Sequence, residues 1–384
     1  MDRIYLDINA TAPLAPAVKS WLARGDVFWA NPASQHSSGK RAAYELELCR
    51  DDLFTRFSIS EKDFEVFYHS GVSEAVNNFV LSWALSHPAG LFVYSPLDHA
   101  CVLSQLPRLK RLGVDVIPMV LTSQGELNLA DTLQAIRARG KSGEQVFIQF
   151  TWVHNEIGVV WPLEQAVELK HALGALVHVD AAQAVGKTEA CFQLRGELDF
   201  YSFSAHKVAG LKGHGWSFQR RAVALEGIVL GGGQQSLRSG TLNVMGATAL
   251  RLALQDLAAS WHPVRQRAQI TRLRTAMGEW LQGRGTLVAA EAQSLNLNTV
   301  FFVLNSLRSD QSLPLFDLAG LEISAGAACS SGAAKAGHVL EYLGYRERAR
   351  HGLRLSLPWW LTDEEFEATQ ERLKKVFLNL PVVV

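Results

Sequence analysis

The chain has 384 residues, of which 48% are hydrophobic and 19% are charged, values typical of a folded protein with a large core and room for two domains. This composition excludes an intrinsically disordered chain. Lys plus Arg and Asp plus Glu both number 37, a balance that lacks the basic surface used to bind nucleic acids or anionic membranes, so we expect neither partner.

The N-terminus and the cysteines indicate a cytoplasmic protein. Residues 1–7 lack the apolar core of a signal peptide, and no apolar run in the chain is long enough to span a bilayer. The four cysteines are widely spaced and form no CxxC pair. This spacing favours free thiols in a reducing compartment and offers no zinc motif, so we expect no metal site.

Between residues 64 and 203, short apolar runs alternate with helical patterns. The predicted strands are 64–69, 91–95, 115–120, 146–151, 175–180 and 199–203. The predicted helices between them are 73–86, 100–112, 129–139 and 162–173. Such alternation predicts βαβ units, and hence an α/β fold with a mostly parallel sheet.

After residue 243 the pattern changes to that of a second, smaller α+β domain. One long helix is predicted from residue 244 to the Gly-Arg-Gly break at 283–285, and a charged amphipathic helix near 363–378. We predict a large domain of residues 15–257. The predicted small domain combines residues 1–14 with residues 258–384.

Polar side chains follow two of the predicted strands. Asp180 ends one strand, and Ser204, His206 and Lys207 follow the next. Because the C-terminal ends of parallel strands face the ligand crevice, these strands bring an acid and an amine to one pocket. That pair suits pyridoxal phosphate (PLP), whose aldehyde reacts with a lysine and whose pyridine nitrogen pairs with a carboxylate. The ordinary alternative is a helix-capping Asp and a solvated Lys.

Residues 69–74, His-Ser-Gly-Val-Ser-Glu, follow a predicted strand and open a helix. Gly71 lets the backbone approach an anion, Ser73 offers a hydroxyl, and the first N–H groups of the helix are free to bind it. This pattern predicts a phosphate site. An ordinary turn with Ser73 as the helix cap explains the same residues equally well.

Four other residues are candidates for the crevice. His99 and Asn155 each follow a strand, and an imidazole at His99 could stack on a flat ring and carry protons. Asn31 lies in a turn-rich loop, where binding groups collect. Arg354 is the lone arginine of a predicted half-buried strand, and its planar fork suits a carboxylate if it faces the pocket. Each residue also fits an ordinary capping or surface role.

Two segments are rich in small residues. Residues 322–337 surround Cys329 with Ala, Gly and Ser, which predicts a mobile loop around a thiol that is either reactive or merely buried. The glycine-rich segment 231–241 suits a mobile loop, a second phosphate contact through Thr241, or a loop at a subunit boundary. The residues alone do not choose between these roles.

Taken in order, these motifs resemble those of the PLP-dependent cysteine desulfurases of the NifS/IscS group, in the class-V aminotransferase superfamily. The resemblance covers nearly the whole chain, and it implies a fold type I PLP enzyme that acts as a homodimer. The matching residues are Tyr5-Leu6-Asp7, Ala10-Thr11, Asn31-Pro32-Ala33-Ser34, Gly71 to Glu74, His99, Asn155 to Gly158, Asp180, Gln183, Ser204 to Lys207, Arg238 to Thr241, Cys329 and Arg354.

The resemblance also implies a role for each residue. Lys207 would bind PLP covalently and move the Cα proton, Asp180 would pair with the pyridine nitrogen, and Cys329 would take the sulfur of L-cysteine as a persulfide, releasing L-alanine. His99 would stack on the ring and assist proton transfer. Arg354 and Asn31 would bind the substrate carboxylate. The other cofactor contacts would come from Val72, Ser73, Asn155, Gln183, Ser204, His206 and the partner subunit's Thr241.

The chain departs from the family pattern in ways that leave its sulfur acceptor open. Ala12 stands where a second Thr is usual and Gln235 where Glu is common, but neither change removes a chemical group that the reaction needs. The chain stops short of the C-terminal extension that housekeeping members use to dock an iron–sulfur scaffold. Iron–sulfur cluster assembly, tRNA thiolation and cofactor synthesis remain possible destinations. The alternative functions are a selenocysteine lyase, a class-V aminotransferase or a non-catalytic sulfur carrier.

Overall fold

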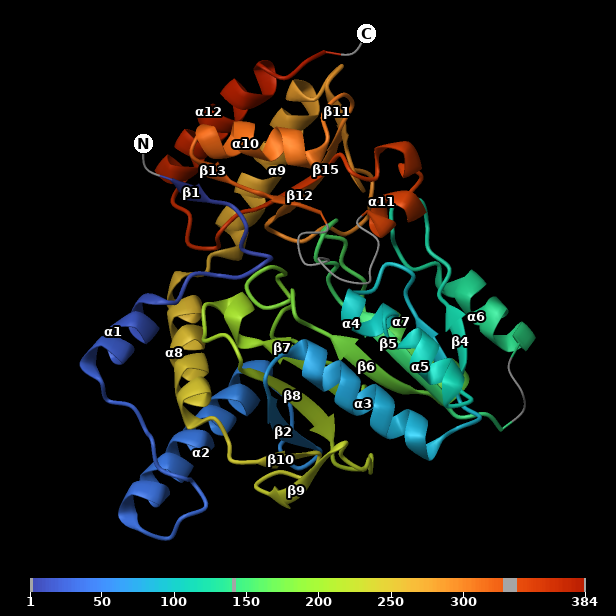
Figure 1. Ribbon diagram of the computed structural model, residues 1–384, viewed down its shortest axis with the longest axis vertical. Coiled ribbons are helices and arrows are strands. Elements are labelled where there is room, and N and C mark those ends of the chain that lie inside the picture. The colour runs from blue at the N-terminus through green and yellow to red at the C-terminus, as the bar shows by residue number, and fades with distance from the viewer. Residues whose placement is uncertain (1–2, 140–142, 327–336, 383–384) are drawn as a thin grey trace.

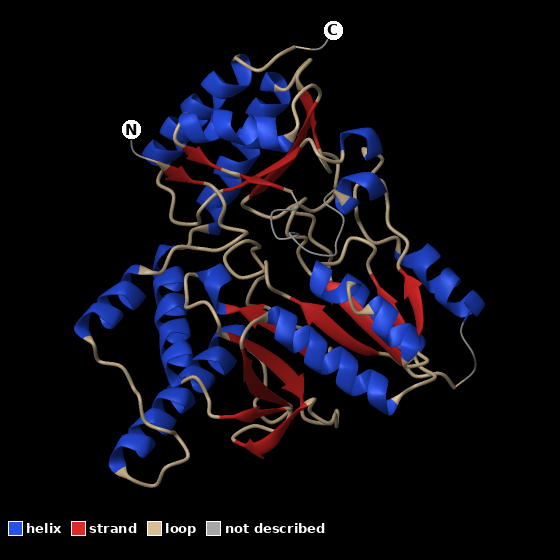
Figure 2. Ribbon diagram, in the orientation of Figure 1, coloured by secondary structure: helices blue, strands red, loops and turns tan. Residues whose placement is uncertain are grey.

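The computed structural model describes residues 3–139, 143–326 and 337–382, and two sheets organise them (Figure 1). A seven-stranded sheet is built from strands between residues 64 and 220. A four-stranded sheet is built from strands between residues 285 and 356. Figure 2 shows helices packed around both sheets. The domain boundaries given above remain predictions.

The seven-stranded sheet has the order β2-β8-β7-β6-β5-β3-β4. Every neighbouring pair is parallel except the two pairs that involve β8, which runs antiparallel to β2 and β7. The predicted α/β fold with a mostly parallel sheet is therefore confirmed. The strands are β2 (Phe64–His69), β3 (Leu91–Tyr94), β4 (Asp115–Pro118), β5 (Val146–Thr151), β6 (Leu176–Asp180), β7 (Phe200–Ser204) and β8 (Gly215–Arg220).

The helices of this part of the chain follow the predicted pattern with one exception. The predicted helix 100–112 is in fact two helices, α4 (Ala100–Leu103) and α5 (Leu106–Arg111). Pro107 lies in the first turn of α5, and because proline has no N–H it cannot continue a helix from Leu103. The other helices are α1 (Pro16–Arg24), α2 (Ser37–Phe57), α3 (Val72–Ser86), α6 (Leu129–Arg139) and α7 (Leu163–Leu173).

The long helix predicted from residue 244 is wrong, because the chain forms α8 (Val244–Ser260) and α9 (Pro263–Trp280) instead. Pro263 begins α9, and the residue before a proline is disfavoured in helical geometry. His262 accordingly has φ −122° and ψ 87°. The remaining helices are α10 (Ser309–Leu318), α11 (His338–Tyr342) and α12 (Asp363–Leu378), and two 3₁₀ turns lie at η1 (Ala205–Val208) and η2 (Arg346–Arg348).

The four-stranded sheet is antiparallel, with the order β11-β12-β15-β14. The expectation of a half-buried strand around Arg354 is wrong, because β15 lies between two strands and all of its residues are buried. The strands are β11 (Gly285–Leu287), β12 (Thr299–Leu304), β14 (Ser324–Ala325) and β15 (Gly352–Ser356).

Two short parallel pairs complete the fold. β1 (Ile4–Tyr5) pairs with β13 (Leu321–Glu322), so the first described residues lie beside elements that come more than 300 residues later in the chain. β9 (Val229–Gly233) pairs with β10 (Arg238–Gly240), below the large sheet in Figure 1.

Candidate active site

A cavity of about 270 Å³ lies where β5, β6 and β7 end. Most of the residues predicted from the sequence line it, although their roles remain predictions. These residues are Val72, Ser73, His99, Asn155, Asp180, Gln183, Ser204, His206, Lys207 and Arg354. The strand ends deliver them as expected for a mostly parallel sheet, because the C-terminal ends of such strands meet at one edge.

The amine of Lys207 is held by backbone carbonyls of the N-terminal segment. Lys207 follows β7 in the short turn η1, and its Nζ donates to the carbonyl oxygens of Asn9 at 2.6 Å and Ala10 at 2.7 Å. The neighbouring His206 Nδ1 lies 3.2 Å from Thr11 Oγ1, and burial lowers the pKa of this imidazole to about 4. The lysine is thus positioned by residues almost two hundred positions earlier in the chain.

Asp180 is a buried carboxylate at the end of β6. Its Oδ1 accepts a hydrogen bond from the backbone N–H of Ala182 at 2.9 Å. Burial raises the pKa of the Asp180 carboxyl, and the positive charges of His99 and Lys207 act in the opposite direction. A cationic group bound in the cavity would therefore stabilise the ionised carboxylate, which is what a protonated pyridine nitrogen would do.

His99 caps helix α4 with its side chain. Its Nδ1 accepts a hydrogen bond from the backbone N–H of Cys101 at 3.2 Å, so the proton of the neutral ring lies on Nε2. Burial lowers the pKa of this imidazole, while the charge of Asp180 raises it. A neutral imidazole of this tautomer offers an N–H donor to a molecule bound in the cavity.

The turn before α3 presents donors to the cavity. The N-cap is Gly71, so the alternative in which Ser73 caps the helix is wrong. The backbone N–H of Val72 donates to Ser204 Oγ at 3.0 Å, and Ser73 is the second residue of α3. The N–H groups of a first helical turn have no acceptor inside the helix and attract anions. Both serines line the cavity, which makes this end of it suitable for a phosphate.

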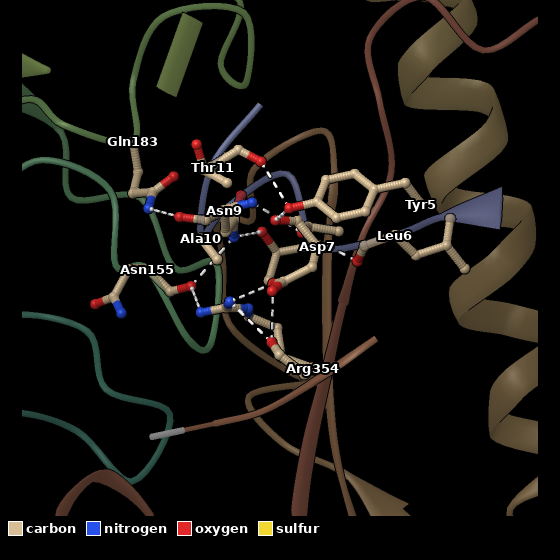
Figure 3. A network of polar contacts seen from close by, with 12 residues as sticks. Tyr5, Leu6, Asp7, Asn9, Ala10, Thr11, Asn155, Gln183 and Arg354 are labelled. Carbon is tan, nitrogen blue, oxygen red and sulfur yellow. Dashed lines mark hydrogen bonds and ion pairs between the residues drawn. The ribbon is translucent and has the colours of Figure 1, made fainter. Parts of the chain in front are cut away.

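Arg354 reaches the cavity from the other sheet (Figure 3). Its Nη2 donates to Asp7 Oδ1 at 2.7 Å and to Ser324 Oγ at 2.9 Å, and its Nη1 donates to the carbonyl of Asn155 at 3.1 Å. The arginine is 3% exposed, and its Nε has no hydrogen-bond partner among the described residues. A buried donor without a partner is costly, and a carboxylate ligand would satisfy it.

Sequence reasoning missed several residues of the site. Asn9 is buried and donates from Nδ2 to Thr299 Oγ1 at 2.8 Å, and Asn9 O accepts from Gln183 Nε2 at 2.9 Å as well as from Lys207 (Figure 3). Backbone carbonyls have no side-chain signature, so no motif could have found this one. Cys101 also lines the cavity, but burial raises the pKa of its thiol and keeps it protonated.

Two predicted residues lie outside the cavity of a single chain. Asn31 and Thr241 are both exposed, and the side chain of Gln234 contacts the segments that carry them. Its Nε2 donates to Asn31 Oδ1 at 2.7 Å, and its Oε1 accepts from the backbone N–H of Leu242 at 3.0 Å. The substrate contact of Asn31 and the cofactor contact of the partner subunit's Thr241 therefore stay predictions.

Cys329 lies outside the described residues, but the described residues on both sides of its segment are close to the cavity. A Cβ placed on Gly326 would be 2.7 Å from Glu156 Oε2, and Glu156 adjoins Asn155 in the chain. On the other side, burial lowers the pKa of His338, while the backbone of Asp98, next to His99, acts on this imidazole in the opposite direction.

Comparisons with known proteins agree with this geometry. The model of the class-V aminotransferase family matches residues 4–368. A cysteine desulfurase of Cereibacter sphaeroides is 33% identical over 98% of this chain and 96% of its own length. The cysteine desulfurase IscS of Glaesserella parasuis is 30% identical over 98% of this chain and 93% of its own. A solved structure of a NifS-like protein is 26% identical and has a TM-score of 0.82, over 97% of this chain and 99% of that one.

Proposed function

Because the chain belongs to the class-V aminotransferase family, and within it to the cysteine desulfurases of the NifS/IscS type, we propose that it converts L-cysteine to L-alanine. The sulfur leaves the substrate and joins the Cys329 thiol as a persulfide, while the thiol proton and the substrate's own protons complete L-alanine. The observation that carries the proposal is one cavity lined by an amine, a carboxylate and a guanidinium, those of Lys207, Asp180 and Arg354.

PLP is the proposed cofactor, and the residues of the cavity fit it. Lys207 would hold its aldehyde carbon and Asp180 its ring nitrogen, with Asn155 and Gln183 at the ring substituents and His99 on the ring. Val72, Ser73, Ser204 and His206 would hold the phosphate. When bound, PLP withdraws electrons from the substrate and so weakens bonds at its Cα and Cβ atoms.

Arg354 is the proposed binding group for the substrate carboxylate. Asp7, Ser324 and Asn155 fix the plane of its guanidinium, and the unpartnered Nε offers a donor to the ligand. A planar fork in a fixed orientation binds a carboxylate with little loss of side-chain entropy. The proposed second contact by Asn31 gains no support from its position outside the cavity.

The chain's own groups also suit the proton transfers that the reaction needs. The Lys207 amine can take the Cα proton, and the His99 imidazole can donate a hydrogen bond from its Nε2–H to the bound molecule. Cys329 would attack sulfur as a thiolate, the reactive form of the thiol. The position of Gly326 and His338 beside the cavity supports the action of this segment there.

We further propose a cytoplasmic homodimer that passes its persulfide sulfur to an acceptor protein. The exposed position of Thr241 supports its proposed contact with the phosphate of the partner subunit's cofactor. Among the described residues, no helix has both the length and the apolarity needed to cross a bilayer.

Release of alanine and sulfide from L-cysteine tests the function directly. We expect the purified protein with PLP to form both products with a reducing thiol present. Cys329→Ala should retain the absorbance of bound PLP and lose turnover by about 100-fold or more, since the sulfur has lost its acceptor. Cys191→Ala, which removes a buried thiol outside the cavity, is the control and should keep turnover.

The same assay separates the alternatives. If Cys329→Ala turns over L-cysteine as fast as the wild type at equal PLP occupancy, the thiol is incidental and the enzyme is a lyase or an aminotransferase. A wild-type protein that favours L-selenocysteine and is indifferent to the loss of Cys329 would identify the selenocysteine lyase. A protein that binds no PLP would point to the non-catalytic sulfur carrier.

A further inference from the structure

A row of buried polar side chains crosses five neighbouring strands of the large sheet. We call it the polar row, and each member is at most 4% exposed. Its members, in the order β2, β8, β7, β6 and β5, are His69, Ser217, Ser202, His178 and Gln149. A parallel α/β core is normally apolar on both faces, so five polar groups in a row call for a physical reason.

Every neighbouring pair in the polar row is hydrogen-bonded. His69 Nε2 lies 2.8 Å from Ser217 Oγ, and Ser217 Oγ lies 2.8 Å from Ser202 Oγ. Ser202 Oγ lies 2.7 Å from His178 Nε2, and His178 Nδ1 lies 2.8 Å from Gln149 Oε1. Pairing of this kind offsets the cost of burial and fixes each side chain in one orientation.

The first contact of the polar row sets its direction. The backbone N–H of Gly71 donates to His69 Nδ1 at 3.2 Å, so the proton of the neutral ring lies on Nε2 and points to Ser217. The two hydroxyls then donate in turn, His178 Nε2 accepts, and His178 Nδ1 donates to Gln149. Burial lowers the pKa of His69 to about 4 and that of His178 to about 3, which keeps both rings neutral.

Close packing also restricts the position of the His69 ring. Gly215 lies opposite it in the neighbouring strand β8, and a Cβ there would be 2.7 Å from His69 Cε1. The ring centroid of Phe67 lies 5.9 Å from that of His69. The imidazole therefore has one position, in which its Nδ1 meets the turn that opens α3.

We propose that His69 is a positioning residue for the anion-binding turn, through the hydrogen bond that its Nδ1 accepts from Gly71. This bond fixes the Gly71 peptide, and the turn then places Val72 and Ser73 in the wall of the cavity, where Ser204 Oγ accepts from the Val72 N–H. His69 touches neither cofactor nor substrate and acts through the backbone. The inference rests on the proposed function, because the anion is the phosphate of PLP.

Two substitutions test the contacts of the two ring nitrogens of His69 separately. Asn carries its side-chain oxygen where His69 has Nδ1, so His69→Asn keeps an acceptor for Gly71 and loses the contact with Ser217. Gln carries its amide where His69 has Nε2, so His69→Gln keeps a donor for Ser217 and loses the acceptor for Gly71. A role in general stability would make the two variants alike, whereas positioning of the turn makes them differ.

The test is equilibrium binding of PLP, and of pyridoxal, which lacks the phosphate, to the apoprotein of each variant. We expect His69→Asn to bind PLP as the wild type does, and His69→Gln to bind it about tenfold more weakly, the usual size of one well-placed hydrogen bond. Pyridoxal should bind all three proteins equally, because its contacts do not involve the turn.

Other outcomes overturn the inference in distinguishable ways. Equal PLP affinities of His69→Asn and His69→Gln, or a parallel loss of pyridoxal affinity, would show that His69 does not position the turn. If His69→Gln fails to fold, His69→Ala also removes the acceptor for Gly71 and should weaken PLP but not pyridoxal; wild-type affinity for PLP would contradict the proposal. A wild-type apoprotein that binds no PLP would overturn the proposed function itself.

Discussion

Arg354 and Asp7 form a buried ion pair that orients the proposed substrate-binding group. The side chains are 4% and 18% exposed, and Ser324 Oγ bridges them by donating to Asp7 Oδ1 at 2.9 Å while it accepts from Arg354. A buried charge whose partner is removed is strongly destabilising, because the remaining charge stays out of water without compensation. Asp7 therefore stabilises both the fold and the position of the guanidinium.

Asp7→Asn tests this role by removing the charge while keeping the shape. We expect the free energy of unfolding to fall by about 3 kcal/mol, since Arg354 stays buried without its partner. The measurement is urea denaturation of the apoprotein. Asp310→Asn is the control: it removes an ion pair with Arg308 whose side chains are 49% and 63% exposed, and it should cost less than about 1 kcal/mol. Equal losses in the two variants would contradict the argument.

Residues that act through their side chains at strand ends could be predicted from the sequence, and those that act through the backbone could not. Asp180, Ser204 and Lys207 follow apolar runs whose direction in a parallel sheet is known, so their meeting at one edge is predictable. The carbonyls of Asn9 and Ala10 that accept from Lys207 carry no such signal. Their position depends on contacts with residues nearly two hundred positions away.

At the scale of elements, the turn of residues 153–160 holds Asn155 at the cavity. His154 organises it: its Nε2 bonds to the carbonyl of Leu97 at 2.9 Å, and its Nδ1 accepts from the N–H groups of Glu156 at 3.1 Å and Ile157 at 3.2 Å. Gly158 closes the turn with φ +72°, a left-handed conformation in which a side chain is strained.

Gly158→Ala should disrupt this turn. A Cβ there would lie 2.8 Å from Asn296 Oδ1 and 2.9 Å from Thr299 Cβ, so steric overlap adds to the backbone strain. We expect a loss of about 2–3 kcal/mol in the free energy of unfolding, with a higher KM for L-cysteine as Asn155 shifts. Thermal unfolding and steady-state kinetics measure the two effects.

Gly174→Ala is the matched control for Gly158→Ala. Gly174 ends α7 with φ +60°, and a Cβ placed there meets nothing within 4 Å. Only the backbone strain of about 1 kcal/mol should appear, and KM should not change. If the two variants were equally stable, the crowding around Gly158 would be irrelevant to the turn.

At the scale of elements, the type of an element could be predicted where its hydrophobic periodicity is clear. The predicted ends of helices were wrong where a single proline interrupts that periodicity. Pro107 and Pro263 each divide a helical pattern that is otherwise continuous. The prediction that β15 is half-buried was wrong for a different reason. Alternation of polar and apolar residues describes a single strand, whereas burial depends on the neighbouring strands β12 and β14, which are distant in sequence.

At the scale of the whole molecule, the N-terminal segment joins the two sheets at the cavity. β1 pairs with β13, and Asn9 N donates to Ser356 Oγ at 3.0 Å, so the segment is attached to the four-stranded sheet and its neighbours. Its carbonyls hold Lys207, which follows a strand of the seven-stranded sheet. The cavity thus needs both sheets, and no local pattern in the sequence reveals this arrangement.

Buried titratable groups give the whole fold a characteristic dependence on pH. Burial lowers the pKa of the His69 and His154 imidazoles to about 4 and that of His178 and His214 to about 3. Three buried carboxyls shift the other way, because burial raises the pKa of Asp98 and Glu156 to about 8 and also raises the pKa of Asp180.

The histidines should therefore make the fold less stable in mild acid. Between pH 6.5 and about 4, the unfolded chain takes up a proton on each of the four imidazoles and the folded chain does not. The free energy of unfolding is therefore undiminished by these groups above pH 6.5 and decreases as the pH falls below it. Each costs up to about 1.4 kcal/mol per pH unit. The three carboxyls oppose this trend, because the folded chain keeps them protonated there. The imidazoles still outweigh them, because burial also lowers the pKa of His99, His206 and His338.

We expect the free energy of unfolding of the apoprotein, from urea denaturation, to decrease steadily from pH 6.5 to pH 5. His214→Asn removes one of the four imidazoles from the titration and should make the decrease less steep. Glu156→Gln removes one of the opposing carboxyls and should make the decrease steeper, because the folded chain then has one fewer group that binds a proton more tightly than the unfolded chain does. A stability that is constant or rises over this range would mean that the histidines are protonated within the fold, and the polar row would then lose its single direction of hydrogen bonding.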